Sequence, residues 1–187
     1  MLVKQAPEKK IEAVPDGETL PIPKYILSWA QYALGLIEKQ KLRYYYGLME
    51  RQFRNVYEKA LKKRGVTGVT MLQMLETRLD NVVFHLGFAT TRAAARQMVC
   101  HGHVKVNGRK VSIPSYALKV NDAIEVKDNN VSRQLATKNI ELSTSRSVPD
   151  WLSMNKDAFK GTVMRIPSRE EIQPIANEQA VVEFYSR

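Results

Sequence analysis

The chain has 187 residues, 44% of them hydrophobic, and a formal net charge of +10. This length allows one or two compact units, and the charge indicates a polyanionic partner, either a nucleic acid or an anionic membrane surface. The single cysteine, Cys100, excludes an intramolecular disulfide and a cysteine-rich zinc site. No apolar run reaches the roughly 20 residues of a membrane-spanning helix, and the first residues lack the pattern of a targeting peptide, so we expect no membrane partner.

The positive charge is concentrated in two neighbouring blocks. Residues 38–64 carry nine basic and three acidic groups, and residues 76–128 carry eight and five, whereas the preceding residues are balanced. We therefore predict four segments. They are a Pro-rich arm, disordered or extended, over 1–24; a basic helical lobe over 25–75; an RNA-binding module over 76–128; and a partly helical C-terminal segment over 129–187 that packs with the helical lobe.

The predicted helical lobe has one apolar and one basic side. Helical periodicity runs over 25–64, with a break expected at Gly47. Cations alternate with aromatic residues in its second half, which suits phosphate contact and stacking on unpaired bases. The cations proposed for RNA contact are Lys39, Lys41, Arg43, Arg51 and Arg54. Three consecutive tyrosines, 44–46, cannot share one helix face, so at least one is expected in the core.

The stretch after Gly65 predicts two helices. Apolar residues recur at helical spacing over 72–86, and Gly87 is expected to end this helix. Thr91 is expected to cap the N-terminus of a short second helix over 92–100. Together they form the helical layer of the module.

The periodicity then changes to two, which predicts strands. Alternating residues indicate strands over 104–106, about 116–120 and 123–126, and Asn107-Gly108 is a strong signal for a tight hairpin turn. A final strand is expected over 181–185. The predicted fold class is α+β, a helical lobe followed by two helices on a small antiparallel sheet.

Basic and polar side chains gather where the second helix of the module meets the strands. Arg92 and Arg96 lie four residues apart, and both are expected to be exposed on one helix face. The whole set comprises Arg92, Arg96, His101, His103, Lys105, Asn107, Arg109 and Lys110. Such an edge supplies cations for phosphates and donors for bases and sugar hydroxyls. Any one of these side chains, taken alone, is most simply interpreted as an ordinary solvated group. The hypothesis of RNA binding therefore rests on their clustering.

Metal binding and catalysis find little support in the residues. Cys100, His101 and His103 offer three ligands within four residues, but a tetrahedral zinc site needs a separated second pair, and the sequence has none at suitable spacing. Neither a nucleophile elbow nor a phosphate-cradling Gly-rich loop is present. We therefore expect no catalytic residue, no metal and no cofactor.

Three stretches together resemble a known family. They are EKQKLRYYYGLMERQF, LQMLETRLDNVVFHLGFA and TRAAARQMVCHGHVKVNGRKVSIPSY, which look like the bacterial small-subunit ribosomal protein S4 family, and the closing PDWLS, PSREEI and VVEFYSR are similar to its C-terminal part. The resemblance, over about 32–187, implies a structural protein that binds 16S-type small-subunit rRNA directly and nucleates assembly of the subunit body. It further implies contact with ribosomal protein S5 and other small-subunit proteins, an effect on decoding accuracy, a place near the channel through which mRNA enters, and a cytoplasmic or organellar ribosome.

The resemblance also carries RNA-facing roles onto particular positions. These are Lys39, Lys41, Arg43, Arg51, Arg54, Arg78, Arg92, Arg96, His101, His103, Asn107 and Arg109. The Pro-rich arm departs from the basic extension that is usual in the family. Two other classes would use the same module: a free RNA-binding regulatory factor, which would not be expected to need the long matching C-terminal part, and an RNA-modifying enzyme such as a pseudouridine synthase, which needs a catalytic domain.

Overall fold

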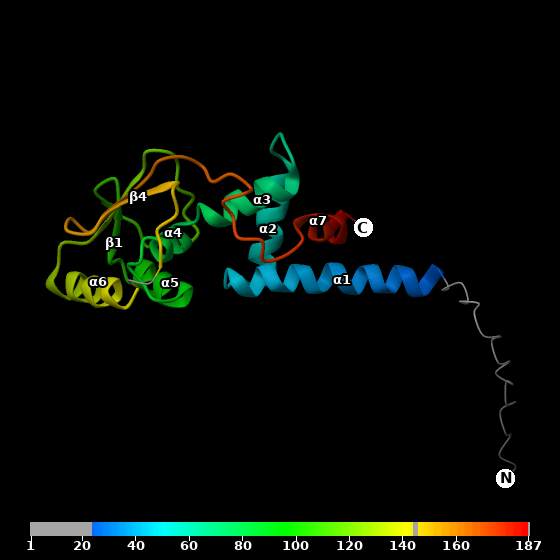
Figure 1. Ribbon diagram of the computed structural model, residues 1–187, viewed down its shortest axis with the longest axis horizontal. Coiled ribbons are helices and arrows are strands. Elements are labelled where there is room, and N and C mark those ends of the chain that lie inside the picture. Colours follow the sequence, from blue (N-terminus) through cyan, green and yellow to red (C-terminus); the bar gives the residue numbers. More distant parts are fainter. Residues whose placement is uncertain (1–23, 144–145, 187) are drawn as a thin grey trace, which may run out of the picture.

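Two hydrophobic cores, one in each half of an elongated molecule, organise the chain (Figure 1). The computed structural model describes residues 24–143 and 146–186. The helical lobe consists of α1 (Lys24–Tyr45), α2 (Glu50–Leu61), α3 (Thr67–Glu76) and α7 (Glu178–Ser186). The sheet module consists of α4 (Leu79–His85), α5 (Arg92–Cys100), α6 (Asn130–Leu142), β1 (Val104–Val106), β2 (Arg109–Lys110), β3 (Ala123–Val126), β4 (Leu152–Asn155) and β5 (Lys160–Val163). Apart from Lys24, the predicted arm lies outside the described residues.

The turn between α1 and α2 forms where the sequence predicts it. Gly47 has a φ of +63°, a left-handed conformation that glycine adopts without a steric cost. Beyond this turn, α2 buries Phe53, Tyr57 and Ala60 on one face and exposes charged residues on the others. The predicted break and the two-sided character of α2 are therefore confirmed.

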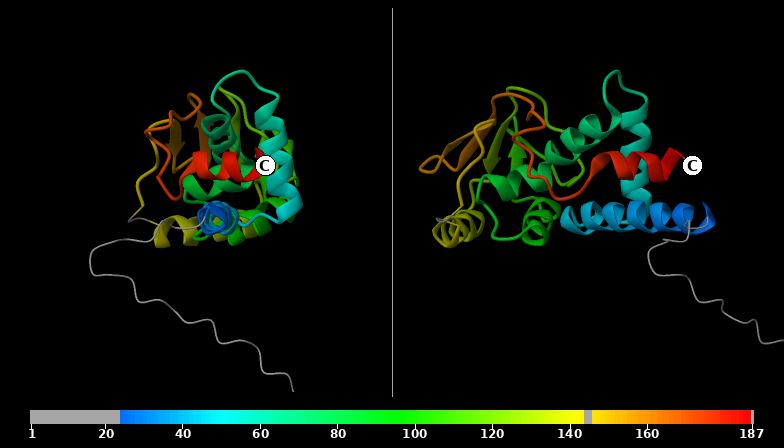
Figure 2. Two further views of the ribbon diagram at one scale, coloured as in Figure 1. Left: turned by 90° about the vertical axis from the view of Figure 1, so that its right-hand side faces the viewer. Right: turned by 45° about the vertical axis from the view of Figure 1, so that its right-hand side comes forward.

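The C-terminal residues form a helix, so the predicted final strand is wrong. α7 packs against α1 and lies beside it in both views of Figure 2, and a Cβ on Gly35 of α1 would lie only 3.1 Å from the Cβ of Phe184. Val181 is buried, and the ring of Tyr185 stacks on that of Tyr57 with centroids 4.8 Å apart. Packing against the other helices of the lobe thus overrides the strand preference of valine and aromatic residues.

The sheet is antiparallel throughout, with strand order β2-β1-β3-β5-β4. Asn107 and Gly108 have φ values of +50° and +77° and form the tight turn between β1 and β2. Val104 and Val106 are buried against α4 and α5, and Lys105 lies on the opposite face. The predicted hairpin, the alternation along β1 and the α+β class are confirmed.

The single helix predicted before Gly87 is in fact two, α3 and α4, separated at Thr77 and Arg78. The main chain of Arg78 is extended and forms an isolated bridge with Ala117. The N–H of Leu118 donates to the carbonyl oxygen of Thr77 at 3.0 Å. This short pairing replaces the strand predicted near Ala117, and a pairing partner so distant in the chain leaves no local signal in a helical apolar stripe.

The C-terminal segment divides between the two halves of the molecule. β4 and β5 extend the sheet, whereas only the part that ends in α7 returns to the helical lobe (Figure 2). The prediction that this whole segment packs with the helical lobe is therefore wrong for β4 and β5. Leu152 and Val163 are buried in the core of the sheet module, and a Cβ on Gly161 would collide with Leu86 of α4. Among the described helices, none is long and apolar enough to cross a bilayer.

Candidate nucleic-acid interface

Arg92 and Arg96 lie where α5 meets the C-terminal end of α1. Thr91 caps α5 as predicted, because its hydroxyl accepts the N–H of Ala94 at 3.1 Å. The guanidinium of Arg92 then lies 3.8 Å from the ring centroid of Tyr45, and that of Arg96 donates to the carbonyl oxygen of Gly47 at 3.2 Å. The prediction that both arginines are fully exposed is wrong. Both are half-buried, and both tie the sheet module to the helical lobe.

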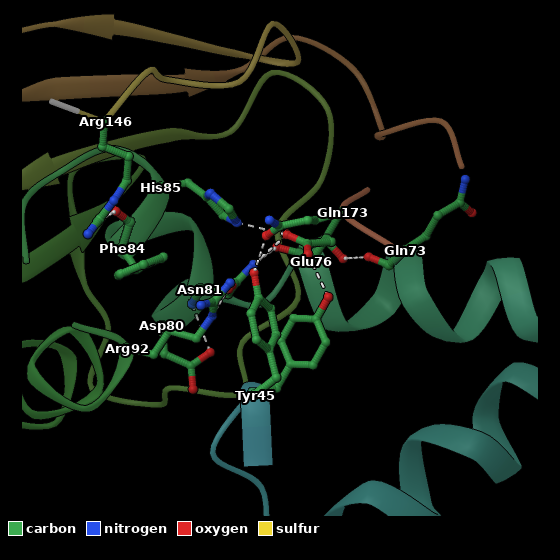
Figure 3. A network of polar contacts seen from close by, with 12 residues as sticks. Tyr45, Gln73, Glu76, Asp80, Asn81, Phe84, His85, Arg92, Arg146 and Gln173 are labelled. Atoms are coloured by element: carbon green, nitrogen blue, oxygen red, sulfur yellow. Dashed lines mark hydrogen bonds and ion pairs between the residues drawn. The ribbon is translucent and has the colours of Figure 1, made fainter. Parts of the chain in front are cut away.

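A buried carboxylate holds this junction together. Glu76 accepts hydrogen bonds from the hydroxyl of Tyr46 at 2.6 Å and the amide of Asn81 at 2.6 Å, and its carboxylate lies 2.9 Å from Nε2 of His85 (Figure 3). Burial alone would raise the pKa of Glu76, but these hydrogen bonds outweigh it and hold the pKa below its ordinary value. Asn81 in turn accepts the Nε–H of Arg92 at 2.8 Å. The two lobes are thereby joined by a network centred on an ionised, multiply bonded carboxylate.

Two of the predicted RNA contacts serve the fold. Lys39 is buried, and its ammonium lies 2.6 Å from the carboxylate of Glu50. Arg78 is buried as well and donates two hydrogen bonds to Asp80, at 3.0 and 2.7 Å. Their assignment to an RNA-facing surface is corrected, because neither charge reaches the solvent. A lysine or arginine that pairs with a carboxylate looks the same in the sequence as one that is free.

The other predicted cations of the helical lobe stay at the surface. Lys41 pairs with Glu38 at 2.5 Å, Arg54 pairs with Glu58 at 3.3 Å, and Arg51 has no ion pair among the described residues. The guanidinium of Arg43 stacks 4.5 Å from the ring centroid of Tyr44. Further exposed cations that the predicted set omits follow on α2 and just beyond it: Lys59, Lys62, Lys63 and Arg64. The run of basic residues in the sequence is the signal by which they could have been predicted.

In the sheet module, the end of α5 and the β1–β2 hairpin form one positively charged edge. The side chain of Lys110 crosses over Gly102, so that a Cβ at this glycine would collide with it. Nδ1 of His103 forms a hydrogen bond of 2.9 Å with the hydroxyl of Ser132. Its pKa is lowered by burial and then by the nearby charges of His101, Lys127 and Lys110. We name this group the cationic edge: His101, His103, Lys105, Arg109, Lys110 and Lys127.

Two positions on the edge differ from the prediction. Asn107 uses its side chain within the turn, because its amide donates to Asp122 at 2.8 Å and its carbonyl oxygen accepts the N–H of Ala123 at 2.9 Å. It is therefore committed to the hairpin and has little capacity left to read a base. Lys127 was missed, although it directly follows the last buried residue of β3. Its backbone N–H donates to His103 at 2.7 Å, which brings it to the edge.

Other kinds of site are not indicated. Within residues 24–143 and 146–186, no group of three or more histidine, cysteine, aspartate and glutamate side chains is placed to hold a metal ion. In the polar network of Figure 3, the carboxylate of Glu76 is occupied by contacts within the protein. The polar groups that the described surface offers to a ligand are therefore mainly the exposed lysines and arginines.

Two helices packed on an antiparallel sheet, with cations along one edge, define a protein of the S4-domain class. Residues 77–124 match the family described as S4 domain, and residues 24–76 match the family described as ribosomal protein S4/S9 N-terminal domain. The two matches meet where α3 ends. They cover the helical lobe up to that point and the sheet module from α4 to the beginning of β3.

Similar proteins extend over most of the chain. Small ribosomal subunit protein uS4 of Opitutus terrae is 60% identical over 165 residues, which are 88% of this chain and 81% of that protein. The proteins of the same name from Akkermansia muciniphila and Thermus thermophilus are 52% and 51% identical, over 84% of this chain and 78% and 76% of their own lengths. The chain belongs to the uS4 family of small ribosomal subunit proteins. The family recognised in the sequence, and the prediction of a ribosomal protein and not an enzyme, are confirmed.

Proposed function

We propose that this chain binds the 16S-type rRNA of the small ribosomal subunit directly and helps to nucleate assembly of the subunit body, in a cytoplasmic ribosome. The observation that carries the proposal is the pair Lys105 and Lys110. These lysines lie directly opposite each other on β1 and β2, and the carboxylate opposite Lys105 on β3, that of Glu125, forms its ion pair with Lys160 at 2.9 Å. Like charges in cross-strand positions destabilise a sheet, and Lys110 lies in addition close to His103. A phosphate backbone bound at this edge offsets the repulsion.

The membership of the uS4 family supports rRNA as the polyanion. Two further exposed side chains at the edge, the guanidinium of Arg109 and the imidazole of His101, have no carboxylate partner among the described residues. On the helical lobe, the exposed cations of α2 offer a second positive surface, and Arg92 and Arg96 at the junction keep the two surfaces in a fixed relation. Such a two-lobed arrangement suits a folded RNA junction better than an isolated strand.

The proposal is tested with full-length 16S-type rRNA and an unrelated RNA of equal length. In filter-retention assays at one fixed salt concentration, we expect the full chain to bind the rRNA at least about tenfold more tightly. In cell extracts, the protein should sediment with the small subunit. Equal affinity for both RNAs, or a protein found only in a free pool, would support the regulatory RNA-binding factor instead.

The apolar face of α1 is the surface that we propose for ribosomal protein S5. Trp29, Leu34 and Ile37 are 71%, 60% and 51% exposed, and exposed apolar side chains gathered on one helix indicate a protein interface. Contact with S5 is the proposed route by which the chain affects decoding accuracy. A position of the chain near the channel through which mRNA enters, among other small-subunit proteins, belongs to the same proposal.

The S5 contact is tested by cross-linking the chain to purified S5. The double variant Leu34→Asp and Ile37→Asp should lose the cross-link, because two charges would be buried in the interface. As a matched control, the double variant Leu135→Asp and Leu142→Asp places the same two charges on exposed apolar positions of α6 and should leave the cross-link intact. Equal loss in both variants would contradict the assignment of this face.

A further inference from the structure

The three consecutive tyrosines at the end of α1 have different surroundings. Tyr46 is buried and bonded to Glu76, and Tyr45 stacks on Arg92. Tyr44 projects from the helix with 72% of its surface exposed. It makes no ring contact with another aromatic side chain among the described residues. The ring of an exposed tyrosine leaves a large apolar surface in contact with water. Because this ring lies beside basic residues, it is a candidate contact for a ligand.

A cleft adjoins this ring. It has a volume of about 200 Å³ and lies where the end of α1 meets α5, with Tyr44, Gly47 and Arg96 among its lining residues. This volume is below the roughly 300 Å³ at which pockets for drug-sized ligands begin, so the cleft suits a single planar group. The one carboxylate in its lining, Asp80, is neutralised by two hydrogen bonds from Arg78.

Guanidinium groups that can donate hydrogen bonds to an anion lie in the lining of the cleft and next to Tyr44. Arg96 uses one of its five N–H groups on Gly47, and no other hydrogen bond of this guanidinium forms within the described residues. Arg43 stacks on one face of the Tyr44 ring, and its Nε is buried with no hydrogen-bond partner in the described part of the chain. Nη2 of Arg92 is in the same condition. An aromatic face with arginines beside it combines a stacking platform with phosphate contacts.

We infer that this cleft binds one unpaired, extrahelical nucleotide of an RNA, with its base stacked on the free face of Tyr44 and its phosphate held by Arg96. The inference rests on the proposed RNA binding and adds a site with its own specificity. Bases within a duplex hide their faces, whereas a bulged base can stack on an aromatic side chain. Because the cleft is built from both lobes, the nucleotide is bound only when the junction is intact.

The probe is a pair of RNA hairpins that differ only in a single bulged 2-aminopurine. We expect the full chain to bind the bulged hairpin at least about fivefold more tightly than the paired one, because base stacking on an aromatic side chain is worth about 1–3 kcal/mol. The fluorescence of the 2-aminopurine should be quenched on binding. Tyr44→Leu should abolish both the preference and the quenching, and Tyr44→Trp should retain them.

A matched control is Tyr116→Leu, which removes another exposed tyrosine without touching the cleft and should change neither readout. Circular dichroism verifies that each variant is folded. Equal affinity of the unmodified chain for both hairpins, or a preference that survives in Tyr44→Leu, overturns the site while RNA binding stands. Failure to bind either hairpin, under conditions in which the chain binds full-length 16S-type rRNA, also overturns the site and leaves the proposed function standing.

Discussion

The junction between the lobes and the cationic edge contain the same residue types in opposite circumstances. At the junction, Arg92 stacks on Tyr45 and donates to Asn81, and the adjoining carboxylate of Glu76 is fully bonded. At the edge, Lys105 and Lys110 lie opposite each other and neither forms an ion pair within the described residues, because the neighbouring Glu125 pairs with Lys160. The geometry of the partners, and not residue identity, therefore separates cations that hold the fold from cations available to a ligand.

The largest effect is expected from removing the buried acceptor of the junction. Glu76→Ala leaves the donors of Tyr46, Asn81 and His85 without an acceptor, and we expect a loss of about 3 kcal/mol in the free energy of unfolding. Urea denaturation measures it. In Glu58→Ala, an exposed carboxylate of α2 is lost, and the change should stay below about 0.5 kcal/mol. Similar losses in both variants would contradict the role of the network.

Arg92→Ala should have the next largest effect. The variant loses the stacking on Tyr45 and Phe84 and leaves Asn81 without its donor, so we expect a destabilisation of about 2 kcal/mol. Arg109→Ala, at the edge, should change the unfolding free energy by less than about 0.5 kcal/mol and weaken RNA binding instead. A stable Arg92→Ala variant together with an unfolded Arg109→Ala variant would contradict the assignment of Arg92 to the fold and of Arg109 to RNA binding.

A smaller effect concerns the pH dependence of RNA binding. In the free protein the pKa of His103 is lowered by burial and by its cationic neighbours, so the ring is mostly neutral near pH 7. A bound phosphate favours the protonated ring, so binding takes up a proton and the affinity should rise as the pH falls from about 8 to about 6. Titrations of RNA binding at several pH values measure this rise. His103→Gln should flatten it, and an unchanged slope in that variant would exclude His103 as the source.

Local features of the fold could be predicted from the sequence because their causes are local. The cap at Thr91, the tight turn at Asn107 and the break at Gly47 each depend on one or two residues. The alternation along β1 likewise follows from one buried face. These elements fix where the cationic edge lies, and most of its members were therefore found.

The predictions from the sequence are wrong where contacts between residues far apart in the chain determine the local structure. α7 is a helix because it packs against α1 and α3, and Arg78 leaves the helical path because Ala117 pairs with it. Lys39 and Arg92 looked like free cations, since the sequence does not indicate that Glu50 and Tyr45 lie beside them. The site was thus predicted in composition, but its division into structural and available charges required the tertiary contacts.

The most direct test of this division is the double variant Lys105→Gln and Lys110→Gln, studied by RNA binding at several salt concentrations and by urea unfolding. If these lysines bind phosphates, the slope of log affinity against log salt should become shallower by about two. The free energy of unfolding should stay the same or rise, because the cross-strand repulsion is removed. An unchanged salt slope combined with a loss of stability would contradict the account.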